Sequence, residues 1–161
     1  MSMEATSPYL LREASAEDGD AIVALINRAF AIERFFKSGD RTDPEQVREM
    51  MHDGKFLLLM DGAATVACVW LQIGADRGYL GTLSVDPERQ RSGLGARMMR
   101  EAEEYFRAAG CKAIDIRLVN LRPELLPIYR KFGFVETGTQ SAEMIRSATC
   151  PVHFITMSKE L

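Results

Sequence analysis

The segment of this sequence best suited to chemistry is a glycine-containing turn near the middle of the chain. It reads Val85-Asp86-Pro87-Glu88-Arg89-Gln90-Arg91-Ser92-Gly93-Leu94-Gly95-Ala96, where we expect a strand to end and a long helix to begin. The first amides of a helix have no partner within the helix and lie at the positive end of its dipole. Glycines there let an anion approach the main chain closely, so the turn is suited to phosphate. Arg89, Arg91 and Arg97 add positive charge.

Two familiar phosphate-binding patterns do not fit this turn. The nucleotide P-loop needs Lys and Ser or Thr after its last glycine, where this chain has Ala96 and Arg97. The dinucleotide fingerprint needs a third glycine, and position 98 is Met98. Two glycines at a strand-to-helix turn are also compatible with tight packing alone, or with a nucleotide-phosphate binder of another kind. Both alternatives stay open at the level of this motif.

Composition narrows the classes of protein to consider. The chain has 161 residues, 47% hydrophobic and 27% charged, which is typical of one globular domain spanning 1–161. The net charge of −3 gives no general attraction to nucleic acid. Apolar stretches are too short to cross a bilayer and the N-terminus lacks a signal-peptide pattern, so we expect a cytoplasmic protein without nucleic-acid or membrane partners. The three cysteines lack metal-ligand spacing, and no metal is expected.

The elements that must position the turn follow from hydrophobic periodicity and from capping residues. Helical spacing predicts a first helix capped by Ser15 with its apolar stripe from Ile22 to Phe30. Further helices are predicted over 43–54, 94–109 and 123–131. Strands are predicted at 9–12, 55–60, 65–73, 79–85, 113–119, 134–137 and 152–157. This order predicts an α/β (α+β) layer arrangement around one mixed sheet.

The turn and two later blocks resemble the GNAT superfamily of N-acetyltransferases. Residues Gln90 to Gly95 have the form Q-x-x-G-x-G, and Tyr129 to Phe134 is similar to the superfamily's Y-x-K-x-G-F block. Asn120 ends a strand nine residues before Tyr129, and the strand that ends at Pro87 has the expected pattern. The resemblance is specific over 79–135. It implies a mixed, mostly antiparallel sheet of about seven strands flanked by about four helices and splayed at a cofactor cleft.

Similarity to this superfamily implies acetyl-CoA as cosubstrate. The main-chain amides of the turn would hold the pyrophosphate, and the preceding strand would pair with the pantetheine arm as though the arm were another strand. The amide of Leu83 would face the thioester oxygen, and Asn120 would bond the pantetheine or adjacent backbone, unless it only caps the next helix. The implied cofactor-binding residues are Leu83, Ser84, Val85, Gln90, Arg91, Ser92, Gly93, Leu94, Gly95, Ala96, Asn120 and Tyr129.

Acyl transfer from a thioester to an amine needs a neutral amine, a stabilised carbonyl oxygen and a proton for the leaving thiolate. The superfamily places its acid at the position of Tyr129, for which core packing is the alternative. Many relatives carry a glutamate early in the strand before the turn, where this chain has Tyr79. Glu33, working through water, is the substitute base, and an exposed loop carboxylate is its alternative. Ordered water or a substrate bound already neutral would also suffice.

The acceptor site is expected between the two N-terminal helices, with the hairpin tip at 138–149 on the other side of the cleft. Phe35 and Phe36 could wall the site and Arg41 could bind a carboxylate, although one phenylalanine in the core and solvated charges are the alternative. The predicted substrate-binding residues are Phe30, Glu33, Phe36, Arg41 and Tyr79. We therefore predict an acetyl-CoA-dependent N-acetyltransferase acting on a primary amine of a small molecule or peptide by direct attack in a ternary complex. A non-catalytic acyl-CoA-binding sensor is the alternative, and a homodimer is left open.

Overall fold

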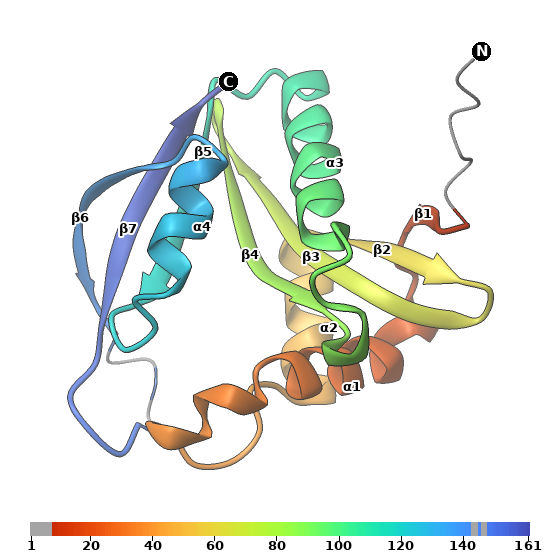
Figure 1. The fold of residues 1–161 in the computed structure, drawn as a ribbon. Coiled ribbons are helices and arrows are strands. Elements are labelled where there is room, and N and C mark those ends of the chain that lie inside the picture. The colour runs from red at the N-terminus through yellow and green to blue at the C-terminus, as the bar shows by residue number, and fades with distance from the viewer. Residues whose placement is uncertain (1–7, 143–144, 146–147) are drawn as a thin grey trace.

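The protein is built around one seven-stranded sheet, seen here in a computed structural model that describes residues 8–142, 145 and 148–161 (Figure 1). The strand order is β1-β2-β3-β4-β5-β7-β6, and only β4 and β5 run parallel. The strands are β1 (Leu10–Glu13), β2 (Lys55–Asp61), β3 (Ala64–Gly74), β4 (Arg77–Val85), β5 (Ala113–Val119), β6 (Val135–Ser141) and β7 (His153–Glu160). This topology confirms the predicted mixed, mostly antiparallel sheet.

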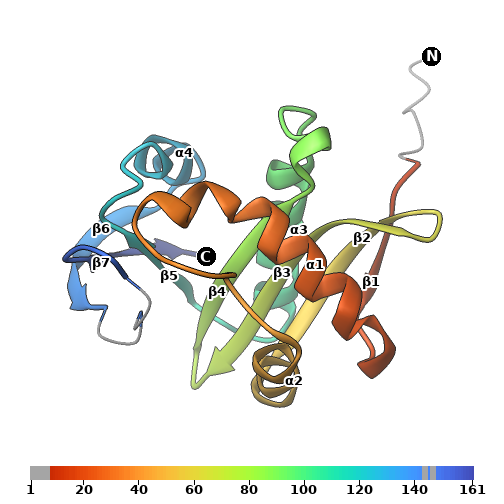
Figure 2. The same cartoon turned by 90° about the horizontal axis from the view of Figure 1, so that it is seen from below.

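Helices cover both faces of the sheet, because each face buries its own set of apolar side chains. The helices are α1 (Gly19–Ala29), α2 (Pro44–Asp53), α3 (Leu94–Ala108) and α4 (Leu125–Lys131), with short 3₁₀ helices η1 (Ala16–Asp18), η2 (Ala31–Phe35) and η3 (Pro87–Arg89). One cluster joins α3 and α4 to the sheet, and a second joins α1 and α2 to it. Figure 2 shows α2 and α3 on opposite sides of the strands. Among the described residues, no helix is long and apolar enough to span a membrane.

The two halves of the sheet separate along the boundary between β4 and β5. Only Arg77, Gly78 and Tyr79 of β4 pair with β5, opposite Ala113 to Asp115. Beyond that point the strands diverge into a V, which Figure 1 shows opening away from the C-terminus. The predicted splay is therefore present, and the edge of β4 that faces β5 is without a strand partner from Leu80 onward.

A bulge in β4 lies next to this opening. Gly81 pairs with Trp70 and Ser84 with Cys68, so Thr82 and Leu83 together lie opposite one residue of β3. Thr82 has a positive φ of 48°, which is uncommon for a β-branched residue. Because side chains alternate along a strand, the extra residue moves Leu83 onto the same face as Leu80, and both pack in the cluster beneath α3.

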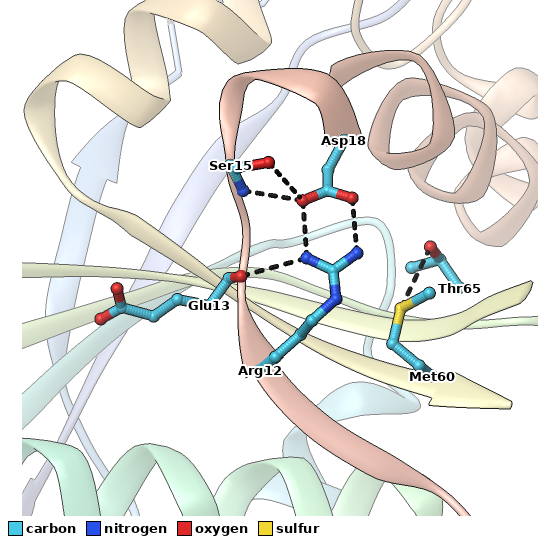
Figure 3. Close-up of polar contacts among 6 residues, drawn as sticks. All are labelled: Arg12, Glu13, Ser15, Asp18, Met60 and Thr65. Carbon is cyan, nitrogen blue, oxygen red and sulfur yellow. Dashed lines mark hydrogen bonds and ion pairs between the residues drawn. The ribbon is translucent and has the colours of Figure 1, made fainter. Parts of the chain in front are cut away.

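A network of polar contacts fixes the entry to the first helix (Figure 3). The carboxylate of Asp18 accepts a hydrogen bond from the Ser15 amide at 2.7 Å, and the guanidinium of Arg12 binds both of its oxygens at 2.7 and 2.8 Å. Nearby, the Thr65 hydroxyl donates to the Met60 sulfur at 3.5 Å. The predicted capping function of the residues from Ser15 to Asp18 is confirmed, although they form η1 before α1 begins.

The structure differs from the predicted elements mainly in the C-terminal half. Strand β6 continues to Ser141, four residues beyond the predicted end at Thr137. All seven of its side chains are exposed, so it lacks the apolar alternation on which the prediction relied. The predicted hairpin tip at 138–149 is therefore partly strand, and its positions 143–144 and 146–147 lie outside the described residues.

Candidate active site

The glycine turn lies between the end of β4 and the start of α3, as predicted. Its backbone is unusual, since Arg91 and Gly93 have φ values of 68° and 82°. Gly93 is the N-cap of α3, and the helix ladder starts with the Arg97 amide bonded to the Gly93 carbonyl at 3.0 Å. A Cβ added at Gly93 would meet nothing within 4 Å. The amides from Gly93 to Ala96 thus precede the first helical hydrogen bond, and Gly93 borders open space, which is the arrangement an anion needs.

The side chains of the turn mostly stabilise its shape. Arg89 forms an ion pair with Asp61 at 2.7 Å, and the Gln90 amide donates to the Val85 carbonyl at 3.3 Å. The Ser92 hydroxyl donates to the Arg89 carbonyl, and Arg97 donates to the carbonyl of Tyr9 at 3.4 Å. Of the three arginines predicted to add positive charge, Arg91 is the exposed one. The anion site would therefore depend on main-chain amides more than on arginine side chains.

The strand edge beside the turn provides main-chain groups at the opening. Ser84 is fully buried, and its hydroxyl donates to the Thr82 carbonyl at 2.8 Å. The Thr82 hydroxyl is buried and has no hydrogen-bond partner among the described residues. Leu83 lies in the bulge between them, at the position where the sequence predicts an amide facing the thioester.

Tyr129 lies on α4 and is 9% exposed. Its ring packs edge-to-face against Phe132 and Phe134, with centroid distances of 6.1 and 5.8 Å. Burial raises the pKa of Tyr129 to about 12, and the nearby charge of Arg122 opposes this rise. The nearby Tyr79 raises the pKa of Tyr129 further. Tyr129 therefore keeps its proton at neutral pH.

Glu33 lies in η2 and is only 5% exposed, so the alternative of an exposed loop carboxylate is wrong. Its Oε2 is 3.3 Å from a guanidinium nitrogen of Arg122, which follows β5 in the chain. Arg122 also pairs with Glu124 at 3.1 Å. The sequence offered no signal for Arg122, because its partner lies 89 residues away.

The other predicted substrate-binding residues separate into a cleft group and a core residue. The guanidinium carbon of Arg41 lies 5.4 Å from the centroid of the Phe30 ring. Arg41 interacts electrostatically with Glu33 and Tyr79, so these four predicted residues come together. Phe36 instead is fully buried in a third cluster with Val119 and Phe154, whereas Phe35 is 61% exposed.

Asn120 has a clear structural function. Its side-chain oxygen accepts from the His153 amide at 2.9 Å, and its own amide donates to the His153 carbonyl at 2.9 Å. These bonds continue the pairing of β5 with β7, and the bond from His153 to the Asn120 side chain does not cap α4. Contact of Asn120 with a cofactor stays a prediction.

Sequence reasoning missed a polar cavity of about 480 Å³ on the sheet face opposite α3. Its lining includes Gln72, Tyr79, Asp115, Arg117, Gln140 and Thr156. A usable signal was present in β5, where Asp115 and Arg117 alternate with Ile114, Ile116 and Leu118. This alternation places the charged pair on one face and the apolar residues on the other.

The described residues offer no metal site, and two of the three thiols are buried. No group of three or more His, Cys, Asp or Glu side chains among them could hold a metal ion. Burial raises the pKa of Cys68 to about 12 and also raises that of Cys111. The thiols of these two free cysteines therefore stay protonated, whereas the third, Cys150, is exposed.

Comparison with known proteins agrees with this arrangement of helices and strands. The acetyltransferase (GNAT) domain family matches residues 15–161. A protein of Oryza sativa subsp. japonica named "Probable glucosamine 6-phosphate N-acetyltransferase 2" is 34% identical over 85 residues, 53% of this chain and 49% of that protein. The mycothiol acetyltransferase of Clavibacter michiganensis is 30% identical over 125 residues, 74% of this chain and 40% of that protein. The chain thus spans half or less of these two relatives.

Solved structures share the whole fold. The ribosomal-protein-S18-alanine N-acetyltransferase of Escherichia coli superposes with a TM-score of 0.77 at 16% identity, covering 94% of this chain and 93% of that one. The IAA acetyltransferase of Bacillus cereus gives 0.76 at 15% identity, covering 95% and 99%. These identities support the fold alone. Since the family match extends over nearly the full length of the chain, the protein belongs to the GNAT acetyltransferase family.

Proposed function

We propose that the protein transfers an acetyl group from acetyl-CoA to a primary amine of a small molecule or peptide, by direct attack in a ternary complex. One observation carries this proposal. The edge of β4 that leaves β5 at Tyr79 leads directly into the glycine turn at the start of α3. A long ligand with an extended arm and a diphosphate would find main-chain partners along that whole path.

The residues along this path fit acetyl-CoA. Gly93 leaves open space over the helix start, and Gly95 leaves room up to Val85, whose nearest atom would be 4.0 Å from an added Cβ. These glycines, with the amides from Arg91 to Ala96, would hold the diphosphate. Residues Leu83 to Val85 would pair with the arm, because an unpaired strand edge offers both donors and acceptors. Bound acetyl-CoA supplies the acyl group as a thioester.

Three groups of this chain would serve the transfer, in which a C–N bond forms as the C–S bond breaks. The Leu83 amide, held by the bulge, would donate to the acyl oxygen as negative charge develops there. Tyr129 would give its proton to the departing sulfur, and its burial supports this because the phenol stays protonated until needed. Glu33, through water, would take the proton that the amine loses.

Contacts with arginines favour Glu33 over Asp115 as the base. Asp115, the carboxylate that lines the cavity, is bound by Arg77 at 2.6 and 2.8 Å. That contact lowers the pKa of Asp115 and makes it a weak base. Glu33 has a single longer contact with Arg122 and interacts with Arg41 on the cleft side.

The names of relatives support an amine acceptor without identifying it. One is named for glucosamine 6-phosphate and another for mycothiol. Each is matched over half its length or less, so the acceptor of this chain has to be found by experiment.

Two measurements on the purified protein test the proposal. Calorimetry should show binding of coenzyme A, and acetyl-CoA should release free thiol faster with amines than without them. The amine panel should contain amino sugars, amino acids, polyamines and peptides with free N-termini. Absence of coenzyme A binding would overturn the proposal. Binding without thiol release from any amine would instead favour the acyl-CoA sensor, whose support is the tyrosine at position 79.

A further inference from the structure

The polar cavity adjoins the opening between β4 and β5, and its charge indicates what it binds. It lies on the sheet face of Trp70, whose indole donates to the Met50 carbonyl of α2 at 2.7 Å. Tyr79 lines this cavity and is also the last residue of β4 that pairs with β5. A molecule in the cavity would therefore lie beside the point where the proposed cofactor path begins.

Arg117 enters the cavity from β5 without a carboxylate partner. Its guanidinium carbon lies 4.6 Å from the Phe154 ring centroid and 5.7 Å from that of Tyr79. Among the described residues, no carboxylate comes within ion-pair distance of Arg117, although Asp115 lies two positions away and pairs with Arg77. Aromatic contacts hold a guanidinium by its flat face, and the N–H groups of Arg117 that do not contact the Tyr79 hydroxyl are available to an anion.

Arg41 brings a second positive charge near Arg117, although it does not line the cavity. It is half-buried between η2 and α2, and no ion pair joins it to a carboxylate of the described chain. Burial lowers the pKa of Arg41, the charges of Glu33 and Tyr79 oppose this, and the positive charge of Arg117 lowers it further. The two arginines are thus close enough to repel each other.

The surrounding charges do not neutralise this pair. Lys37 is 8% exposed, and its pKa is lowered by burial and by the charge of Arg41. The carboxylate of Glu33 is already paired with Arg122 at 3.3 Å, and Asp40 pairs with Arg34 at 3.3 Å. Withdrawing several cations from water without matching carboxylates is unfavourable, and a bound anion would remove that cost.

We infer that the acceptor amine carries an anionic group, a phosphate or a carboxylate, and that Arg117 binds it, with the positive charge of Arg41 nearby. A guanidinium group provides paired N–H donors that match the oxygens of either anion. Binding at Arg117 would hold the amine end of the same molecule near Tyr79 and the proposed acyl site. This inference rests on the proposed acetyltransferase function and specifies its substrate class.

The test measures a second anion site while coenzyme A fills the first. Inorganic phosphate and, separately, succinate are titrated by calorimetry into the protein saturated with coenzyme A, at constant ionic strength. We expect one of the two anions to bind, and Arg117→Gln and Arg41→Gln to weaken that binding at least fivefold. Arg117→Lys keeps the charge and should recover part of the affinity. Arg100→Gln, which removes an exposed charge from α3, should bind like the wild type.

Turnover provides the second readout. Glucosamine 6-phosphate is compared with glucosamine, and methionine with methioninamide, by thiol release from acetyl-CoA. We expect kcat/KM to favour the anionic member of one pair at least tenfold, and Arg117→Gln to remove this preference mainly through KM. The inference is wrong if neither anion binds the coenzyme A complex. It is also wrong if the Arg117→Gln and Arg41→Gln variants bind the anion as tightly as the wild type does. Failure to bind coenzyme A would instead overturn the proposed function itself.

Discussion

At the scale of single residues, burial decides which side chains can hold or move a proton. Tyr129 and Glu33 are both nearly closed from solvent, but their surroundings differ. The tyrosine is surrounded by phenylalanine rings, which favour its neutral form. The glutamate instead lies beside Arg122, 3.3 Å from a guanidinium nitrogen. The proposed acid thus lies among aromatic rings, whereas the proposed base lies in a polar contact.

Replacement of Tyr129 by phenylalanine tests the acid. Tyr129→Phe keeps the packed ring but removes the proton, so kcat should fall on the order of 100-fold while KM for acetyl-CoA changes little. Because the pKa is about 12, the wild-type kcat should show no loss from this group below about pH 10. Steady-state kinetics across pH measure both effects. Tyr105→Phe on α3 is the matched control, and an unchanged kcat in Tyr129→Phe would remove the phenol from the mechanism.

At the scale of elements, the start of α3 combines a left-handed backbone with room for a ligand. Gly93 has a φ of 82°, so any other residue there strains the turn whatever it does to binding. Gly95 lies in the first turn of the helix without a positive φ, and an added Cβ meets no atom closer than 4.0 Å. Substitutions at Gly95 therefore separate ligand binding from folding.

Gly95→Glu should abolish coenzyme A binding without unfolding the protein. A carboxylate in the first helical turn interacts favourably with the helix dipole. It would, however, occupy the diphosphate site and repel the diphosphate. We expect affinity to fall at least 100-fold by calorimetry, with a thermal midpoint equal to or above the wild type. Gly95→Ala should stay within tenfold of the wild-type affinity. Wild-type affinity in Gly95→Glu would mean that the turn is only structural.

The contacts of Asp18 with Arg12 and with the Ser15 amide predict that the stability of the protein depends on pH. Asp18 has a pKa of about 2, lowered first by its hydrogen bonds to Arg12 and then by the Ser15 amide, whereas the unfolded carboxylate titrates near ~3.9. The ionised form therefore contributes stability above about pH 4, and this contribution is lost as the pH falls toward 2. Asp18→Asn should lower the free energy of unfolding by about 1 kcal/mol at pH 7. The difference should shrink at pH 3.

Urea denaturation at the two pH values measures this difference. Glu17→Gln, at an exposed neighbouring position, should have little effect at either pH. Equal losses for Asp18→Asn at pH 7 and at pH 3 would contradict the assignment of the effect to the ionised carboxylate.

At the scale of the whole molecule, contacts far apart in sequence hold the two halves of the sheet together below the opening. The β4–β5 pairing covers only the three residues from Arg77 to Tyr79. Beyond it, Glu33 pairs with Arg122, and the Thr149 amide donates to the Phe36 carbonyl at 2.7 Å. The segment that carries the proposed base thus also joins the N-terminal half to the C-terminal half.

Glu33→Gln should therefore affect both stability and catalysis. Leaving Arg122 without its buried partner should lower the free energy of unfolding by about 1–3 kcal/mol. If Glu33 accepts the amine proton, kcat should also fall at least tenfold, well below the unfolding temperature. Glu124→Gln removes the other partner of Arg122. Because the Glu124 side chain is 54% exposed, this change should have little effect on the free energy of unfolding or on kcat. Lower stability with unchanged kcat would make Glu33 a structural residue only.

Much of the fold could be predicted from sequence because its signals are local. Strand β5 and helix α3 were placed within a residue of their bounds, since apolar periodicity and capping residues act over a few neighbours. Strand β6 extends beyond its predicted end because it is exposed throughout, and η2 shows no helical apolar stripe because Ile32 and Phe35 face solvent. The bulge at Thr82 left no apolar signal of its own.

What the sequence by itself determined was the order of elements, the glycine turn and the position of Tyr129, because these depend on residue type and short spacing. Only the tertiary structure decided that Glu33 is buried against Arg122 and that Arg117 lines a cavity beside Tyr79. The reason is physical. Burial and charge pairing depend on which segments meet across the sheet, and such meetings between residues up to 89 positions apart leave no local pattern in the chain.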